Sequence, residues 1–140
     1  AYLGEGALFC GDTLFAGGCG RVFDGTFAQL SASLRRIAAL PPETLIYCAH
    51  EYTLANLGFA KWVEPDSAVL AERQREARRL RAAGLPTVPS RLDLELATNP
   101  FLRTGEPRVI AAAEGFAGRR LQGHAEVFTA LRQWKDRRYD

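Results

Sequence analysis

The chain of 140 residues is 47% hydrophobic and 24% charged, values typical of a folded globular domain that exclude a disordered or fibrous chain. Eighteen basic and 16 acidic residues leave a net charge of +2, too balanced to indicate a nucleic-acid or membrane partner. Residues 119–140 hold six basic and three acidic side chains, a local excess that favours small anions. No stretch approaches the roughly 18 consecutive apolar residues of a membrane-spanning helix.

The first half of the sequence predicts strands on either side of one helix. Apolar runs at residues 7–10 and 44–48 are typical of buried strands. Between them we expect a glycine-rich loop over residues 11–25, followed by a helix that begins at the capping box formed by Thr26 and Gln29. This order predicts two parallel strands joined by a right-handed crossover that packs on a sheet.

From Thr53 onward the predicted elements are helical. Thr53 is expected to cap a helix that runs to about Val63, Asp66 to cap the next helix, and Gly84 to end it. The second helix carries interspersed arginine and glutamate, a pattern more typical of a solvated, ion-paired surface than of a nucleic-acid face. Three further helical stretches are predicted, at residues 90–97, 108–116 and 124–137.

The change of composition near residue 53 divides the chain into residues 1–52, which contain strands, and residues 53–140, which are helical. Two or three short strands do not form a stable open sheet, so we expect further strands upstream of Ala1 or from another chain. The sequence has no Met, and residues 1–4 read like the end of a strand. These features favour a fragment of a longer protein.

Three cysteines, Cys10, Cys19 and Cys48, make an odd number without C-x-x-C spacing. This favours a reducing compartment over a disulfide framework, and we expect the cytoplasm. Apart from Cys48, which is near His50, none has a neighbour spaced to activate it as a nucleophile. Buried structural thiols are the favoured interpretation.

Asp12 and His50 each follow one of the two predicted strands. Groups just beyond the carboxyl ends of such strands converge on a ligand crevice. A carboxylate and an imidazole together suit zinc, iron or manganese, and a carboxylate can bridge two ions. Each residue also has a structural interpretation, as a hydrogen-bonded group of a turn or strand end, and two ligands are too few for a catalytic zinc. Spacing alone therefore leaves both alternatives open.

Two other features have weaker functional interpretations. Residues 17–21, Gly-Gly-Cys-Gly-Arg, lack the spacing of a phosphate-binding glycine motif. We expect a backbone loop that passes close to a ligand, with Arg21 offering its guanidinium to an anion. His124 is expected to be an exposed or helix-capping residue rather than a metal ligand.

Short motifs follow one another in order along nearly the whole chain. They are Gly11-Asp12-Thr13-Leu14-Phe15, Gly17-Gly18-Cys19-Gly20-Arg21, Gly25-Thr26, Leu40-Pro41-Pro42, His50-Glu51-Tyr52-Thr53, Asn56-Leu57, Phe59-Ala60, Glu64-Pro65, Pro86-Thr87-Val88-Pro89-Ser90 and Asn99-Pro100-Phe101-Leu102-Arg103-Thr104. Together they closely resemble the glyoxalase II family, the hydroxyacylglutathione hydrolases of the metallo-β-lactamase fold.

The resemblance implies an α/β fold: the second part of an αββα sandwich in residues 1–52, followed by a helical glutathione-binding domain in residues 53–140. It implies two divalent metal ions (zinc, iron or manganese), with Asp12 as the bridging ligand and His50 as a ligand of one ion. The family's other five ligands lie in motifs that precede the start of this chain. The site is therefore expected to be incomplete here, and the chain alone inactive.

The resemblance also implies five substrate-binding residues. Arg21 and Phe23 fall in the loop that meets the glutathione tripeptide, although many members have Tyr at the position of Phe23. Tyr52 matches a substrate-binding tyrosine. Arg132 and Lys135 match a cationic pair that holds the glycine carboxylate of glutathione, and their spacing places them on one face of a helix.

The activity that the resemblance implies is hydrolysis of S-D-lactoylglutathione and related 2-hydroxyacyl-glutathione thioesters, by a hydroxide that the two metal ions generate. The products are glutathione and a hydroxy acid, a step of methylglyoxal detoxification, and the complete protein is expected to be a cytoplasmic monomer with no nucleic-acid or membrane partner. Two alternatives stay open. One is a non-catalytic glutathione-binding or interaction module, and the other is a related metallo-β-lactamase-fold hydrolase of another thioester.

Overall fold

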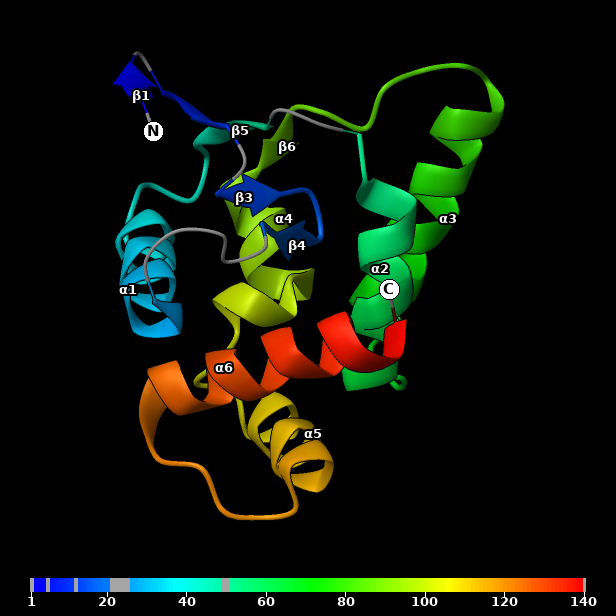
Figure 1. Ribbon diagram of the computed structural model, residues 1–140. Coiled ribbons are helices and arrows are strands. Elements are labelled where there is room, and N and C mark those ends of the chain that lie inside the picture. The colour runs from blue at the N-terminus through cyan, green and yellow to red at the C-terminus, as the bar shows by residue number, and fades with distance from the viewer. Residues whose placement is uncertain (1, 5, 12, 21–25, 49–50, 140) are drawn as a thin grey trace.

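A small sheet lies on top of a layer of helices in the computed structural model of the chain (Figure 1). The structure describes residues 2–4, 6–11, 13–20, 26–48 and 51–139. The strands are β1 (Tyr2–Gly4), β2 (Ala7–Gly11), β3 (Leu14–Phe15), β4 (Gly18–Cys19), β5 (Leu45–Cys48) and β6 (Ser90–Arg91). The α-helices are α1 (Phe27–Ala38), α2 (Thr53–Val63), α3 (Ala68–Ala82), α4 (Leu92–Thr98), α5 (Pro107–Ala117) and α6 (Gly123–Trp134). Over the described residues, none of these helices is long and apolar enough to cross a membrane.

The main sheet has the strand order β1-β2-β5-β6. Strands β2 and β5 are parallel, with Leu8 opposite Ile46, and α1 connects them, which confirms the parallel strand pair predicted from the strand–helix–strand pattern. Strand β1 is antiparallel to β2, and β6 is antiparallel to β5. Because β6 comes from the second half of the chain, the sheet is built from both halves.

The predicted capping box begins α1. The hydroxyl of Thr26 accepts a hydrogen bond from the amide of Gln29 at 3.1 Å, and the side chain of Gln29 accepts one from the amide of Thr26 at 2.8 Å. Leu34 and Ile37 then point into the core from the same face of the helix. The apolar period and the cap thus fix both the start of α1 and the face that it buries.

Two predicted helix caps are wrong. Tyr52, not Thr53, occupies the cap position of α2, because the Thr53 hydroxyl bonds with Thr87 and donates to the Glu51 carboxylate. At the start of α3 the cap is Ser67, whose hydroxyl accepts from the amide of Leu70 at 3.1 Å, rather than Asp66. In α3 the neighbouring serine was the better-placed cap, whereas in α2 no side chain caps the helix because the Thr53 hydroxyl is engaged elsewhere.

Two other segments differ from the prediction. The stretch expected to be a loop contains the short antiparallel hairpin of β3 and β4, which turns at Gly17 with a φ of 78°. Residues Ser90–Arg91 are extended rather than helical, since they pair with Leu45 and Ile46 of β5. Both differences arise from contacts with distant parts of the chain that no local period reveals.

The last predicted helices are confirmed within a few residues. Gly84 ends α3 and Gly118 ends α5, with φ values of 73° and 71° in the left-handed region that favours glycine. A 3-10 helix at Pro100–Leu102 follows Asn99 and separates α4 from α5. Helix α6 ends at Trp134, and a π-helical turn continues from Lys135 to Tyr139.

One hydrophobic core joins the two halves of the chain. It includes Leu8 and Ile46 from the sheet and Phe59, Phe101 and Phe128 from the helical part, each at most 4% exposed. The ring of Phe59 lies 5.9 Å from that of Phe101, and the ring of Phe101 lies 5.7 Å from that of Phe128. The sheet and the helices therefore bury their apolar surface against each other.

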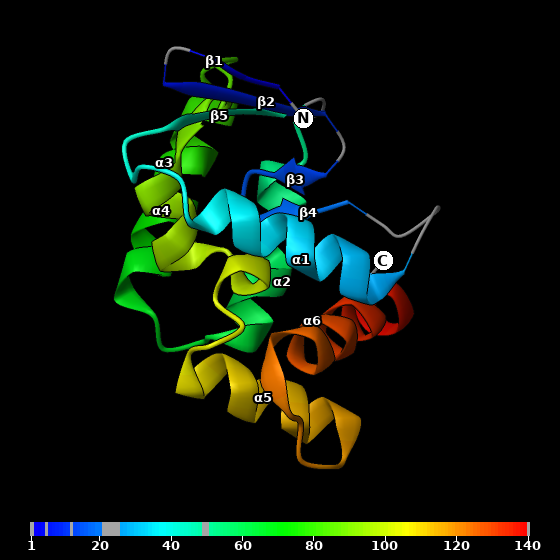
Figure 2. The same ribbon diagram turned by 90° about the vertical axis from the view of Figure 1, so that its left-hand side faces the viewer.

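The opposite face of the sheet also carries apolar side chains. Phe9 is 47% exposed and Leu45 is 37% exposed, and the ring of Phe9 stacks on that of Tyr47 at 4.9 Å. Figure 2 shows the described helices on the other side of the sheet. Along β2 and β5, apolar residues thus face both sides of the sheet, as in strands that are covered on both faces.

Candidate substrate-binding site

A cavity of about 320 Å³ lies between the β3–β4 hairpin, the start of α2 and the end of α6. Its walls contain three of the residues that the sequence singled out, Tyr52, Arg132 and Lys135, which come from opposite ends of the helical half. The other lining residues are Phe15, Cys19, Ala55 and Asn56. The volume lies in the range of small-ligand sites in proteins.

Tyr52 stands at the mouth of this cavity. Its position just before the first turn of α2 leaves the side chain 50% exposed. The ring meets that of Phe15 edge to face, with centroids 5.2 Å apart. The contact between β3 and the start of α2 fixes one wall of the cavity.

Arg132 forms the inner wall and is fully buried. Its Nη1 donates to the carbonyl oxygens of Cys19 at 3.0 Å and Gly20 at 3.4 Å. Its Nε and Nη2 donate to one carboxylate oxygen of Asp136 at 3.1 and 2.7 Å, and the guanidinium lies 5.4 Å from the ring centre of Phe101. Burial lowers the pKa of Arg132, but Cys19 and Asp136 outweigh this effect and raise it, so the side chain remains charged.

Lys135 lines the same cavity from the turn that follows α6 and is 7% exposed. The predicted placement of Arg132 and Lys135 on one side of the C-terminal helix is thus confirmed, although the α-helix itself ends between them. Apolar residues such as Phe128 and Leu131 draw this face of α6 into the core. Two cationic side chains, both buried, are thereby carried to the wall of the cavity.

Cys19 adds a neutral thiol to the wall. It is 3% exposed, and burial raises the pKa of its thiol to about 11, against the opposing influence of Arg132. At neutral pH this cysteine is a buried thiol, as the sequence predicts, and not a nucleophile.

Four predicted site residues, Asp12, Arg21, Phe23 and His50, lie outside the described residues. The strands that precede Asp12 and His50 are hydrogen-bonded neighbours, with Gly11 of β2 opposite Cys48 of β5. Within the described ranges, no group of three or more His, Cys, Asp or Glu side chains could hold a metal ion. His124 is exposed, as expected, with its Nδ1 2.7 Å from the hydroxyl of Thr104.

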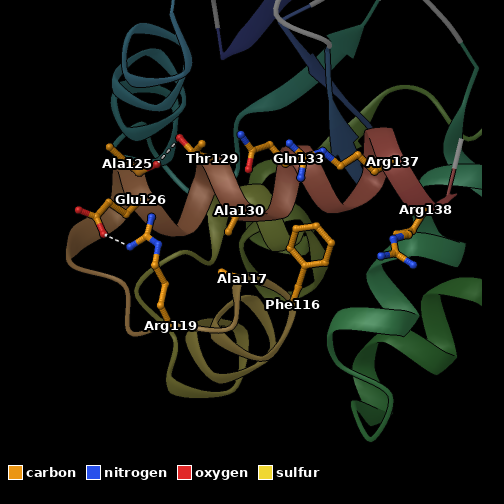
Figure 3. Close-up of a pocket in the computed structure, with 10 residues that line it drawn as sticks. All are labelled: Phe116, Ala117, Arg119, Ala125, Glu126, Thr129, Ala130, Gln133, Arg137 and Arg138. Atoms are coloured by element: carbon orange, nitrogen blue, oxygen red, sulfur yellow. Dashed lines mark hydrogen bonds and ion pairs between the residues drawn. The ribbon is translucent and has the colours of Figure 1, made fainter.

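A second cavity, of about 400 Å³, lies between α5 and α6 (Figure 3). Figure 3 shows Phe116, Ala117 and Ala130 between Arg119 on one side and Arg138 on the other. Arg119 is paired with Glu126 at 3.3 Å. None of the predicted site residues lines this cavity, so the smaller one is the candidate substrate site.

The group that holds the cavity's hairpin in place was not predicted from the sequence. Glu95 and Asn99 are both fully buried and bond to the backbone between Phe15 and Gly18. Their spacing from the buried Leu92 places all three on one face of α4 and its extension. A carboxylate on the apolar face of a short helix was the available signal of a buried polar network.

Comparison with known proteins gives the class first. Residues 1–50 match the metallo-beta-lactamase superfamily, and residues 51–138 match the family described as hydroxyacylglutathione hydrolase C-terminus. The fold is accordingly mixed α/β with mostly helical content. The chain belongs to the hydroxyacylglutathione hydrolase family.

Curated relatives agree with this assignment. A hydroxyacylglutathione hydrolase of Halorhodospira halophila is 58% identical over 97% of this chain and 53% of the relative. The corresponding proteins of Alkalilimnicola ehrlichii and Pseudomonas aeruginosa are each 57% identical, over 97% and 92% of this chain and 53% and 50% of the relatives. The chain thus spans about half the length of the curated relatives that it matches.

Proposed function

We propose that the protein hydrolyses glutathione thioesters, with S-D-lactoylglutathione and related 2-hydroxyacyl-glutathiones as substrates, and that this chain supplies the wall that binds glutathione. The main support is the cavity that Tyr52, Arg132 and Lys135 line together, although Tyr52 lies some 80 positions before the other two in the chain. The names of the curated relatives support the same activity.

Lys135 and Tyr52 are the proposed direct contacts with the tripeptide. An enclosed ammonium group attracts a carboxylate more strongly than an exposed one because water screens it less. Tyr52, half exposed at the mouth, offers a ring face and a hydroxyl to the peptide. Arg132 is already held by Asp136 and two carbonyl oxygens, so it supports the site by its charge and by fixing the hairpin.

Asp12 and His50 are the proposed metal ligands of this chain. The pairing of Gly11 with Cys48 at the ends of two parallel strands supports their convergence, because both residues follow those strand ends in the sequence. A carboxylate and an imidazole are suitable ligands for zinc, iron or manganese. Divalent ions bound there would lower the pKa of water and polarise a thioester carbonyl. Arg21 and Phe23 are proposed to contact the tripeptide from the loop that follows β4.

The apolar outer face of the sheet supports the αββα sandwich. Phe9, Leu45 and Tyr47 present a surface that a second sheet layer would cover. We propose that a segment corresponding to the N-terminal half of the relatives provides this layer, with the boundary between the two domains near residue 52. The cytoplasm is the proposed location of the complete protein, because glutathione is a thiol peptide of reducing compartments. A monomer is the proposed oligomeric state.

The test joins this chain to the N-terminal half of the Halorhodospira halophila relative and measures turnover of S-D-lactoylglutathione. We expect metal-dependent hydrolysis that is lost in the Asp12→Ala and His50→Ala variants. A separate test of the cavity measures the binding of S-methylglutathione to the 140-residue chain by calorimetry. Turnover that survives exhaustive chelation would overturn the metal assignment.

The same experiment separates the alternatives. A chain that binds S-methylglutathione but gives a fusion without turnover would be a glutathione-binding module. A fusion that cleaves other thioesters and ignores glutathione thioesters would be a related hydrolase with a different substrate. Either result would overturn the proposed activity.

A further inference from the structure

A buried carboxylate holds the β3–β4 hairpin against the helical part of the chain. Glu95 of α4 is fully buried. Its Oε1 accepts hydrogen bonds from the amide of Gly17 at 3.0 Å and from the side chain of Asn99 at 3.0 Å. Its Oε2 accepts from Arg73 at 2.5 Å and from the hydroxyl of Ser90 at 2.7 Å. One side chain therefore links the hairpin turn, α3, β6 and the end of α4.

Two asparagines make further hydrogen bonds to the hairpin backbone. The side-chain amide of Asn99 donates to the carbonyl oxygens of Gly18 at 3.0 Å and Phe15 at 3.4 Å. Asn56 of α2 donates to the carbonyl oxygen of Ala16 at 3.3 Å. The backbone from Phe15 to Gly18 thus bonds to helical side chains at each of its four residues.

The hairpin also fits its seat closely. A Cβ atom on Gly17 would come within 2.8 Å of Leu57, and one on Gly18 within 2.7 Å of Asn56. Neither position has room for a side chain without a shift of its neighbours. The hairpin backbone is therefore held both by close packing and by hydrogen bonds.

Burial of a carboxylate is costly, and replacement of such an ion pair by apolar residues is often neutral or stabilising. Here four donors, one of them the charged Arg73, compensate the charge. Because an apolar core would provide stability equally well, the network is best explained by the geometry that it imposes.

The hairpin that Glu95 holds is adjacent in sequence to the proposed site residues. The amide of Gly20 donates to the carbonyl oxygen of Thr13 at 3.2 Å and closes the base of the hairpin. In the sequence, Asp12 directly precedes Thr13 and Arg21 directly follows Gly20. Consecutive Cα atoms are 3.8 Å apart, so a shift of the hairpin base would shift both neighbours.

We infer that Glu95 is a positioning residue: through Gly17 and Asn99 it fixes the hairpin whose two ends carry the proposed metal ligand Asp12 and the proposed glutathione contact Arg21. This inference rests on the proposed function for its effect on activity. Its structural part, the hold on the hairpin, is independent of substrate.

The test compares Glu95→Gln with a matched control, Glu64→Gln. Glu64 is 7% exposed and accepts from Arg103 through both of its oxygens, at 2.6 and 3.0 Å. Both substitutions weaken a buried ion pair with arginine. A glutamine at position 95 has one oxygen where the network needs two. The charged Arg73 takes that oxygen because its hydrogen bond is the stronger, so Gly17 loses its acceptor.

Amide exchange of Gly17 in the 140-residue chain is the first readout, with Ala113 of α5 as the internal reference. We expect Glu95→Gln to speed exchange at Gly17 by about tenfold relative to Ala113, and Glu64→Gln to leave this ratio within about twofold. An unchanged ratio in Glu95→Gln would overturn the hold on the hairpin, whatever the substrate is.

Affinity and turnover form the second readout. In Glu95→Gln we expect binding of S-methylglutathione to weaken by about fivefold and kcat of the fusion with the relative to fall by about tenfold, with Glu64→Gln close to the parent. Equal losses of affinity and kcat in both variants would overturn the positioning role, because Glu95 would then contribute only to general stability. If the parent itself neither binds nor turns over, the proposed function fails while the exchange result stands.

A milder variant covers the case in which Glu95→Gln does not fold. Asn99→Ala removes the bonds to Phe15 and Gly18 but leaves the Arg73–Glu95 pair in place. The same increase in exchange at Gly17 is expected. Its absence would contradict the inference.

Discussion

Arg132 donates from Nη1 to the carbonyl oxygen of Cys19 at 3.0 Å, across 113 positions of sequence. The last helix of the chain thereby supports a hairpin near its beginning. Removal of the guanidinium would leave two carbonyl oxygens and Asp136 without their present donor. Several consequences of this arrangement, and of the surrounding site, can be measured.

Arg132→Met is expected to destabilise the chain by about 3 kcal/mol, because it unpairs a buried network without changing the length of the side chain greatly. Arg132→Lys should lose less stability. It keeps the charge, but it lacks the planar guanidinium that donates both to the hairpin carbonyl oxygens and to Asp136. Urea unfolding measures both. The exposed Arg138, changed to Met, serves as the control and should alter stability by less than about 0.5 kcal/mol. A loss as small as the control's in Arg132→Met would contradict the structural role.

Lys135→Gln is expected to raise KM of the fusion for S-D-lactoylglutathione by about tenfold with little change in kcat, because a distant carboxylate is held similarly in the ground and transition states. The chain has one other lysine, Lys61, which does not line the cavity, so Lys61→Gln is a matched control. Steady-state kinetics distinguishes the two parameters. A large fall in kcat at unchanged KM would speak against a substrate-binding role for Lys135.

Cys19 predicts a loss of stability at alkaline pH. Burial raises the pKa of its thiol in the folded chain from 9.0 to about 11, so the contribution is fully present below pH 9 and is lost as the pH rises through 11. By pH 10 the free energy of unfolding should fall by about 1 kcal/mol from this group. Cys19→Ala should make the decrease between pH 8 and pH 10 smaller by that amount. An identical decrease in parent and variant would show that Cys19 titrates normally.

Gly18→Ala tests the close fit of the hairpin. The new Cβ would lie within 2.7 Å of Asn56, so we expect a loss of about 1–3 kcal/mol. Gly115→Ala, in the last turn of α5 with nothing within 4 Å of the new Cβ, should instead stabilise by about 0.5 kcal/mol through helix propensity. Thermal or urea unfolding should therefore give opposite signs. Equal effects would mean that the hairpin can move aside freely.

The outer face of the sheet tests the proposed sandwich. In the 140-residue chain, Phe9→Ser should change stability by less than about 1 kcal/mol, because the ring is half exposed. In the fusion it should cost about 2 kcal/mol or more, because a second layer would bury the ring. The difference between the two backgrounds is the measurement. Equal costs would argue that no layer covers this face.

The sequence predicted the parts of the fold that depend on local signals. The capping box of α1 and the glycine at the end of α3 follow from residues close together in the chain. The parallel pair of β2 and β5 follows from the order of two apolar runs with one helix between them. Strand β6 could not be found in this way, since Ser90–Arg91 is extended through its pairing with β5. The Thr53 cap failed for a similar reason, because Thr87, 34 positions away, takes its hydroxyl.

The candidate site likewise contains residues that the sequence predicted and one that it did not. Tyr52, Arg132 and Lys135 were found through the resemblance of their motifs, and the structure brings them to one cavity. Glu95 was missed because its importance depends on four partners, all of them outside Leu92–Thr98. The glutathione-binding roles of these three cavity-lining residues remain predictions, as do the glutathione contacts and metal ligands at residues 12, 21, 23 and 50.

Strand β6 has a consequence for any attempt to produce the helical half alone. Its two residues shield the backbone of β5, which would otherwise end the sheet with unsatisfied amides and carbonyls. Cutting the chain near residue 52 would strip that shield from one piece and leave the other with an unpaired extended segment. Both pieces would then be prone to aggregate through exposed strand edges, so the two halves are better expressed as one polypeptide.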